Sequence, residues 1–308
     1  MNSDDHIRAT VIRHRRDPAR RVPAQLLLAR TWRERGDFRR AGLLLGLTLA
    51  TAERHHGPGS LAVAAVCNEW GVLGKYDGRF DRSAVLYRRA LAIYRRHFGE
   101  HHDTVATICH NLGGLEHARG RPYEGEAWAA RSVAIRTALH GAESPLVAAD
   151  LAAWAALLDG CGRLDDAERH LRTAVAILSG AAGGDVDPAH IMEVAAAMHN
   201  LAAVQHRRAR LQDALLGYRR ALALKEQHRG RGHPELATTL VGLATLHRQL
   251  GEPHSAEQLY GRAIRLLTGQ VAADHPVLTA ALRGRAAVQR TDAPVSRGPA
   301  VRQAVMDG

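Results

Sequence analysis

The sequence is poor in aromatic residues and in β-branched runs. Aromatic side chains make up 4% of the 308 residues, although apolar residues as a whole make up 46%. This composition favours many small alanine and leucine interfaces, as between stacked helices, over one large aromatic core. The abundant alanine, leucine, arginine and glutamate favour helix. The sequence therefore predicts an all-α protein.

Cysteine and long apolar runs are also scarce. This argues against disulfide-rich, zinc-binding and membrane-spanning proteins. Cys67, Cys109 and Cys161 lack the paired spacing of a disulfide framework or a zinc site. No apolar run approaches the roughly 20 residues that a membrane span needs, and the polar N-terminus does not have the layout of a signal peptide. Free thiols fit a reducing compartment. We therefore expect a cytoplasmic protein with no metal, no cofactor and no membrane partner.

Lysine is nearly missing, since it occurs only at Lys75 and Lys225. The net charge of +11 therefore comes almost entirely from arginine. A positive field favours acidic partners. Nucleic acid is the alternative ligand, and steep salt dependence with little sequence preference would mark it.

Glycines repeat along the chain with a period of 42 residues. Gly36, Gly78, Gly120 and Gly162 are followed, after a five-residue insertion, by the pair Ala209 and Gly251. Glycine suits the left-handed residue that ends one helix before a tight turn. Small residues follow each turn residue at five and at twelve positions, which places them on one helix face and predicts a close helix crossing in every repeat. These residues are Ala41, Ser83, Gly125, Ala167, Ala214 and Ala256, and Thr48, Ala90, Ser132, Ala174, Ala221 and Ala263.

A third marker closes each unit in the phrases His102-Asp103, Ser144-Pro145, His233-Pro234 and His275-Pro276. Proline permits a helix to start, because its missing N–H is not needed in the first turn. Each unit is thus a first helix, a glycine turn, a longer second helix and a loop. We expect six hairpins from about Val22 to Ala273 and a capping helix over residues 276–289, about 13 helices in all. Residues 1–20 form a basic extension, 21–290 the repeat array and 291–308 a disordered tail.

Two phrases connect this pattern to a known family. His110-Asn111-Leu112-Gly113 and His199-Asn200-Leu201-Ala202, with the small residues and the His-Pro loops, resemble the 42-residue tetratricopeptide repeats of the kinesin light chain type, in their bacterial form. The resemblance covers about Val22 to Arg290. It departs at Ala153 and Gly242, which replace the asparagine, and at Asn68, which lies one position earlier. It implies a right-handed superhelix, an α-solenoid. HEAT and armadillo repeats have similar periods but lack this register.

The resemblance also implies a concave groove that binds a peptide and is lined by the first helices. The asparagine amide both donates and accepts, so it can hold a peptide main chain, whereas Arg and Lys hold carboxylates. Alternatively, the asparagines only bridge neighbouring helices. Small residues leave space for ligand side chains at Ala65, Ala149, Ala152, Ala156, Ala196 and Ala203. The predicted peptide-binding residues are Arg33, Asn68, Lys75, Tyr76, His110, Asn111, His117, His199, Asn200, His206, Arg207 and Arg248, and Asp159 and Gln249 hold matching positions.

Two histidine pairs, His110/His117 and His199/His206, share a seven-residue spacing. Seven helical residues span about 10.5 Å, too far for one zinc ion with bonds of about 2.0–2.1 Å. The pairs could bond a peptide as neutral groups, make the groove more cationic below pH about 6.5, or be ordinary exposed histidines. Enzyme motifs are absent, so the sequence favours an adaptor or regulator that binds an acidic segment of another protein in the concave groove. A groove enzyme with histidine acid–base groups is the weaker alternative.

Overall fold

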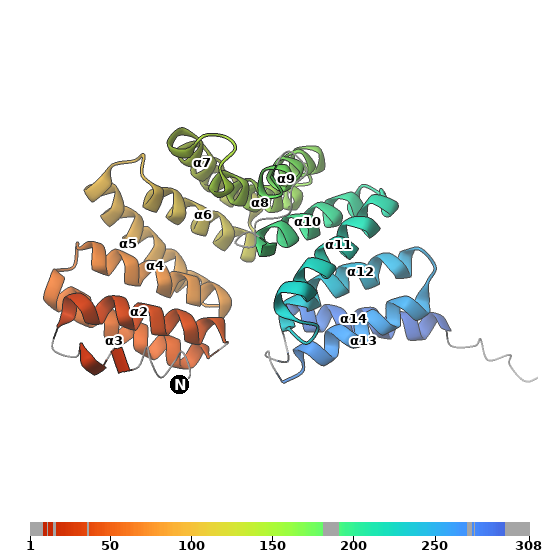
Figure 1. Cartoon of the computed structure of the whole chain (residues 1–308), viewed down its shortest axis with the longest axis horizontal. Helices are drawn as coiled ribbons and strands as arrows, with labels where there is room; N and C mark the ends of the chain where they lie inside the picture. Colours follow the sequence, from red (N-terminus) through yellow and green to blue (C-terminus); the bar gives the residue numbers. More distant parts are fainter. Residues whose placement is uncertain are drawn as a thin grey trace, which may run out of the picture. The chain divides into compact units, whose positions relative to one another are not determined.

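The computed structural model of the protein describes residues 9–10, 12–14, 17–35, 37–180, 191–269, 273 and 275–292. Within them the chain is helical and contains no strand, which confirms the all-α prediction (Figure 1). Six hairpins follow one another, and α14 (Pro276–Asp292) comes after the last. The hairpins are α2 (Pro18–Glu34) with α3 (Phe38–His56), α4 (Leu61–Tyr76) with α5 (Phe80–Phe98), α6 (Asp103–Ala118) with α7 (Pro122–His140), α8 (Pro145–Gly160) with α9 (Leu164–Leu178), α10 (Ile191–Arg207) with α11 (Leu211–Arg229), and α12 (Ala237–Gln249) with α13 (Pro253–Leu267).

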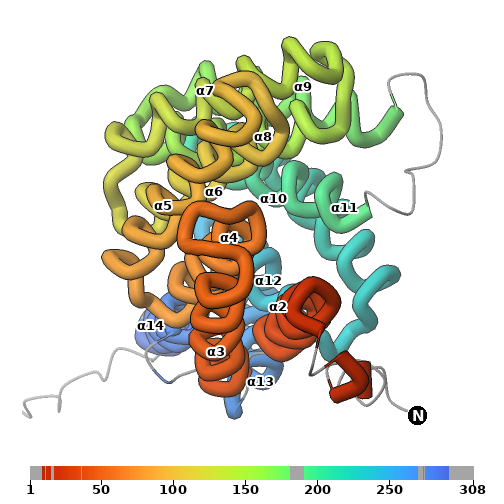
Figure 2. The backbone as a smooth tube through the Cα atoms, turned by 90° about the vertical axis from the view of Figure 1, so that its left-hand side faces the viewer, coloured from red at the N-terminus to blue at the C-terminus, as the bar shows by residue number. Residues whose placement is uncertain are grey.

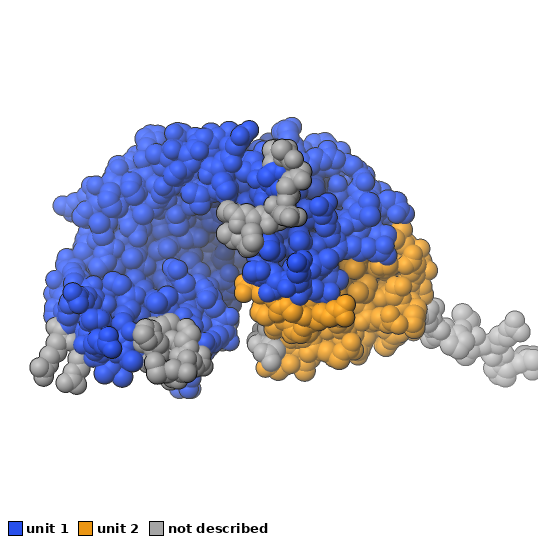
Figure 3. Space-filling model, in the orientation of Figure 1, with its two compact units in different colours: residues 1–228 blue, residues 229–308 orange. Residues whose placement is uncertain are grey.

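The chain divides into two compact units, residues 1–228 and residues 229–308 (Figure 3). Unit 1 contains α2 to α10 and nearly all of α11. Each of its helices up to α10 packs against the next one along the chain, as the backbone tube also shows (Figure 2). Unit 2 contains the short 3-10 helix η2 (Pro234–Leu236), α12, α13 and α14. The 42-residue period did not predict this division. The expected tail from residue 293 and most of the expected basic extension lie outside the described residues.

The turns take the predicted left-handed backbone conformation. Gly78, Gly120, Gly162 and Gly251 have φ between 71° and 81°, and Ala209 adopts φ 57° although it carries a side chain. Gly36 lies outside the described residues. A second set of glycines, which the sequence analysis overlooked, has the same 42-residue spacing at the ends of α3, α5 and α7. Its members are Gly57, Gly99 and Gly141, with φ between 77° and 83°.

The small residues allow the helices to approach closely, as the sequence predicted. All twelve residues at the two small positions of the second helices are buried. A third small position lies seven residues before each turn and is also buried, at Ala29, Gly71, Gly113, Ala155, Ala202 and Ala244. At Gly71 an added Cβ would come within 2.6 Å of the Tyr87 ring. Gly71 on the first helix therefore leaves the space that the Tyr87 side chain of the second helix fills.

The loop residues that precede the first helices cap them. The side chains of Ser60 and Ser144 accept hydrogen bonds from Val63 N and Leu146 N, each at 3.3 Å. His102 Nδ1 accepts from Thr104 N, and His233 Nδ1 accepts from Glu235 N, each at 3.2 Å. Such caps satisfy backbone N–H groups that have no partner within the helix. His102 and His233 of the closing phrases therefore have a structural role.

Candidate functional site

The first helices of the hairpins line the inner side of the arc that unit 1 forms. Figure 1 shows α6, α8 and α10 on the inner side and α7 and α9 on the outer side. Along α6, the residues that are not fully buried form one stripe, which contains Thr107, His110, Asn111, Gly114 and His117. This is the pattern of a helix with one free face. None of the eleven predicted site residues in unit 1 is buried.

At the N-terminal end of this surface, basic side chains from α2 and α4 outnumber acidic ones. Glu69, whose side chain is 7% exposed, accepts a hydrogen bond from Arg33 Nε at 2.8 Å and lies 3.5 Å from Arg30 Nε. Lys75 lies on the same side and has no carboxylate within 4.0 Å among the described residues. Burial, and then repulsion from Arg33, lower the pKa of Lys75. The exposed Glu34 lies 3.8 Å from Arg33 Nη2, so two carboxylates face three cations.

Tyr76 gives these cations an exposed aromatic neighbour. The Arg33 guanidinium lies 5.5 Å and the Lys75 ammonium 5.8 Å from the centre of the Tyr76 ring. The ring also stacks on Phe38 at 6.4 Å. A cation within about 6 Å of a ring face is attracted by its negative charge distribution. The ring thus helps to hold both cations at the surface.

The asparagines of neighbouring first helices are bonded to each other. Asn111 Nδ2 on α6 donates to Asn68 Oδ1 on α4 at 2.8 Å. The two asparagines therefore bridge neighbouring first helices, and their role in peptide binding stays a prediction. Each amide keeps further donor or acceptor capacity for a ligand. Asn200 is half-buried on α10.

A buried ionic network lies directly behind His110, and the sequence analysis missed it. Asp150 on α8 has a fully buried side chain that accepts hydrogen bonds from His110 Nδ1 and from Arg136 Nη1, both at 2.7 Å. The Ser132 hydroxyl donates to its other oxygen. Arg136 Nη2 also donates to the Thr107 hydroxyl at 3.0 Å. Asp150 thereby orients the His110 ring from below the inner surface.

Towards the C-terminal end of unit 1 the charges of the inner surface are paired. Arg207 Nη1 on α10 donates to the Asp159 carboxylate at 2.5 Å and to the Asp159 backbone oxygen at 2.8 Å. On α6, burial lowers the pKa of His117, and the positive charge of Lys75 also lowers it. The Asp159 carboxylate acts in the opposite direction, but the net shift is downwards. The predicted residues of unit 1 therefore form a surface that is cationic at α2 and α4 and balanced at α8 and α10.

Comparisons with known proteins agree with this geometry. Models of the tetratricopeptide repeat match residues 71–103, 104–179 and 193–269. The chain belongs to the tetratricopeptide repeat (TPR) family. The TPR chain is similar to BtubC (BKLC) from P. vanneervenii, with 25% identity and a TM-score of 0.60 over 74% of this chain and 91% of that one. No curated protein matches it.

More distant structures share the TPR fold. A kinesin light chain-like repeat protein of Podosopora anserina matches at 19% identity and a TM-score of 0.51, over 66% of this chain and 94% of that one. A Rap protein complexed with Competence and Sporulation Factor matches at 13% identity and a TM-score of 0.59, over 87% of each chain. These neighbours confirm the solenoid fold class.

Unit 2 of the TPR chain contains the last predicted site residue. Arg248 and Gln249 are exposed on α12. They present a charge and an amide at the positions that the family geometry implies. The role of Arg248 in peptide binding stays a prediction.

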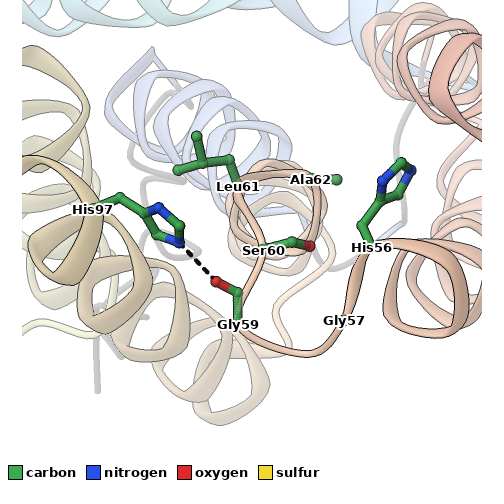
Figure 4. Close-up of a pocket in the computed structure, with 7 residues that line it drawn as sticks. All are labelled: His56, Gly57, Gly59, Ser60, Leu61, Ala62 and His97. Carbon is green, nitrogen blue, oxygen red and sulfur yellow. Dashed lines mark hydrogen bonds between the residues drawn. The ribbon is translucent and has the colours of Figure 1, made fainter.

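Other kinds of site find little support in the described part of the TPR chain. None of its helices is both long and apolar enough to cross a bilayer, and no group of three His, Cys, Asp or Glu residues there could hold a metal ion. A pocket of about 460 Å³ lies at the loop between α3 and α4, where His97 Nε2 is 2.9 Å from Gly59 O (Figure 4). The pocket is lined by His56, Gly57, Gly59, Ser60, Leu61, Ala62 and His97 and has no acidic group. The inner surface stays the predicted peptide-binding site.

We expect the stability of the TPR array to fall between pH about 6.5 and about 4 because of His199. Burial, and then Lys225, lower the pKa of His199 from 6.5 to about 4. Between these two pH values His199 is protonated in the unfolded chain but neutral in the folded chain. Stability therefore falls as the pH falls through this window, and below pH about 4 the contribution of His199 no longer changes. His199→Leu should flatten the slope by up to about 1.4 kcal/mol per pH unit. Urea denaturation at several pH values measures this, and parallel curves for variant and wild type would contradict it.

Proposed function

We propose that this TPR protein is a non-enzymatic adaptor that binds an extended segment of a partner protein along the inner side of unit 1, with acidic residues of the segment at α2 and α4. TPR proteins generally act as scaffolds for protein interactions. The observation that carries the proposal is the unpaired Lys75 ammonium beside Arg33. A carboxylate of the partner would supply the missing counter-charge, and Tyr76 would cover it.

The remaining inner surface suits a peptide main chain of variable sequence. Asn111 and Asn200 can pair with a peptide group whatever its side chain is. The small residues between them, among them Ala149, Ala152, Ala156 and Ala203, are all accessible. They leave room for ligand side chains at α8 and α10, where the charges are already paired. This arrangement supports an acidic stretch at one end of the segment and unspecific main-chain contacts further along.

The test begins with a cross-linked pull-down from the host, which identifies the partner segment by mass spectrometry. A synthetic peptide of that segment is then titrated by calorimetry. Lys75→Glu should weaken binding at least about tenfold, or 1.4 kcal/mol, because it turns attraction into repulsion. This loss should shrink as salt is added. Asn200→Ala should cost about 0.5–1.5 kcal/mol through one lost neutral hydrogen bond.

Arg88→Glu is the matched control, because Arg88 is exposed on the outer helix α5. It changes the net charge by the same amount as Lys75→Glu but leaves the inner surface intact. We choose Lys75 over Arg207 because Asp159 already neutralises Arg207. If Arg88→Glu abolished binding while Lys75→Glu and Asn200→Ala bound normally, the ligand would use the outer face. Recovery of nucleic acid in place of a protein would also refute the proposal.

A further inference from the structure

The chain offers very few amines to chemistry that modifies lysine. Among 42 basic residues only Lys75 and Lys225 are lysines. Lys225 on α11 is 7% exposed, whereas Lys75 on α4 is only half-buried and lies on the inner surface. Arginine stays protonated at any ordinary pH, so its guanidinium is a poor nucleophile. Lys75 is therefore the accessible side-chain amine of the described residues.

The neighbours of Lys75 favour the neutral, nucleophilic form of this amine. Gly114 on α6 faces it without a side chain, since a Cβ there would lie 3.4 Å from Lys75 Nζ. Arg33 on α2 places a second positive charge nearby, and its carboxylate partner Glu69 is buried beneath it. On α6, His117 interacts with Lys75 and favours its own neutral form, although Asp159 on α8 opposes this. Tyr76 shields one side of the amine. Burial and the Arg33 charge therefore disfavour the ammonium, whereas Glu69, which is already bonded to Arg33, the distant Asp159 and the ring face favour it.

We infer that Lys75 is an acyl-acceptor site, modified by activated acyl groups such as acyl phosphates or thioesters. The neutral ε-amine attacks the carbonyl carbon and forms a C–N bond. The bond from that carbon to the phosphate oxygen or to the thiol sulfur breaks, and phosphate or thiolate leaves. The amine releases one proton to water, so the product is a neutral amide. Acylation thereby removes the unpaired positive charge from the inner surface.

The reactivity is tested on the whole chain with acetyl phosphate and, separately, with an acetyl thioester. Arg88→Lys supplies an exposed reference amine on α5 within the same molecule. Peptide mass spectrometry at pH 7 should show Lys75 acetylated at least about threefold faster than the reference, because more of it is neutral. The advantage should disappear above pH about 10.5, where both amines are neutral. An equal or slower rate at Lys75 with both donors would overturn the inference, and a response to one donor alone would identify the source.

A second variant separates the local charge from simple accessibility. Gly114→Asp places a carboxylate next to Lys75 Nζ and should slow its acetylation at least about threefold by favouring the ammonium, while the reference amine reacts as before. Gly114→Ala adds only a Cβ and should keep most of the rate. Equal slowing by both variants would show that access alone sets the rate and would overturn the inference.

The consequence for binding rests on the proposed function. Acetylated protein and Lys75→Gln should both bind the acidic partner peptide more weakly than wild type, with the loss shrinking in high salt. If Lys75 is acetylated rapidly but both forms bind normally, the proposed function fails and the acyl-acceptor site stands. If Lys75 is unreactive but Lys75→Glu weakens binding, the acyl-acceptor site fails and the proposed function stands.

Discussion

Replacing Asp150 with alanine should lower the free energy of unfolding by about 3–5 kcal/mol, the largest effect we expect from a single substitution. Asp150 is fully buried, and its carboxylate neutralises Arg136, whose side chain is 11% exposed. Without it the guanidinium would be left in the core with no counter-charge, and the bonds to His110 and Ser132 would be lost as well. Urea denaturation followed by circular dichroism measures the effect.

Glu100→Ala is the control for this experiment, because it also removes a carboxylate that pairs with two arginines. Glu100 lies 3.0 Å from Arg95 and also bonds Arg131, but its side chain is 46% exposed. Exposed ion pairs stabilise a protein by about 0–1 kcal/mol, so Glu100→Ala should do little. The double variant Asp150→Leu with Arg136→Met should recover much of the lost stability, because it removes both buried charges together. Equal effects of Asp150→Ala and Glu100→Ala would contradict the importance of the network.

The network also shows where sequence reasoning stops. Asp150 occupies the position twelve residues before the turn, where the neighbouring repeats have the buried residues Val66, Ile108 and Ala197. A charged residue at a core position of the repeat was a visible signal. Its partners could not be read from the sequence, because Arg136 and Ser132 lie on a different helix and His110 in a different repeat.

The backbone features, in contrast, followed from the sequence because they are local. The turn glycines act within one hairpin and the small residues follow them at fixed positions, so a fixed spacing was enough to predict both. The environment of Lys75, in contrast, depends on side chains that meet from several repeats. Arg33 on α2 lies one 42-residue period before Lys75, so the spacing places both on one surface, but it does not show that Arg33 repels Lys75 or that Gly114 on α6 leaves the Lys75 ammonium without a facing side chain. The sequence thus predicted which residues share a surface but not which of them are already paired.

We expect Ala174→Leu to destabilise the array by about 1–3 kcal/mol through overpacking. Ala174 on α9 is 0% exposed and belongs to one cluster with Leu151, Val194 and Ala221. The extra carbons have no space in this cluster, so the helices must move apart or adopt strained rotamers. Because stability in a repeat array is close to a sum over neighbouring repeats, the damage should begin locally. Hydrogen exchange should therefore accelerate in α8, α9 and α10 before it does so in α4 and α5.

Ala176→Leu on the same helix is the matched control, since Ala176 is exposed and the added carbons would meet solvent. It keeps the residue change and the helix identical and alters only the face, so any effect of helix propensity is shared by both variants. Its free energy of unfolding should stay within about 0.5 kcal/mol of wild type. If Ala174→Leu and Ala176→Leu unfolded at the same urea concentration, small size at the twelfth position after the turn would not be what allows these helices to approach. The close crossing would then have to depend on the first-helix positions alone, among them Gly71 and Ala155, where the same exchange to leucine would locate it.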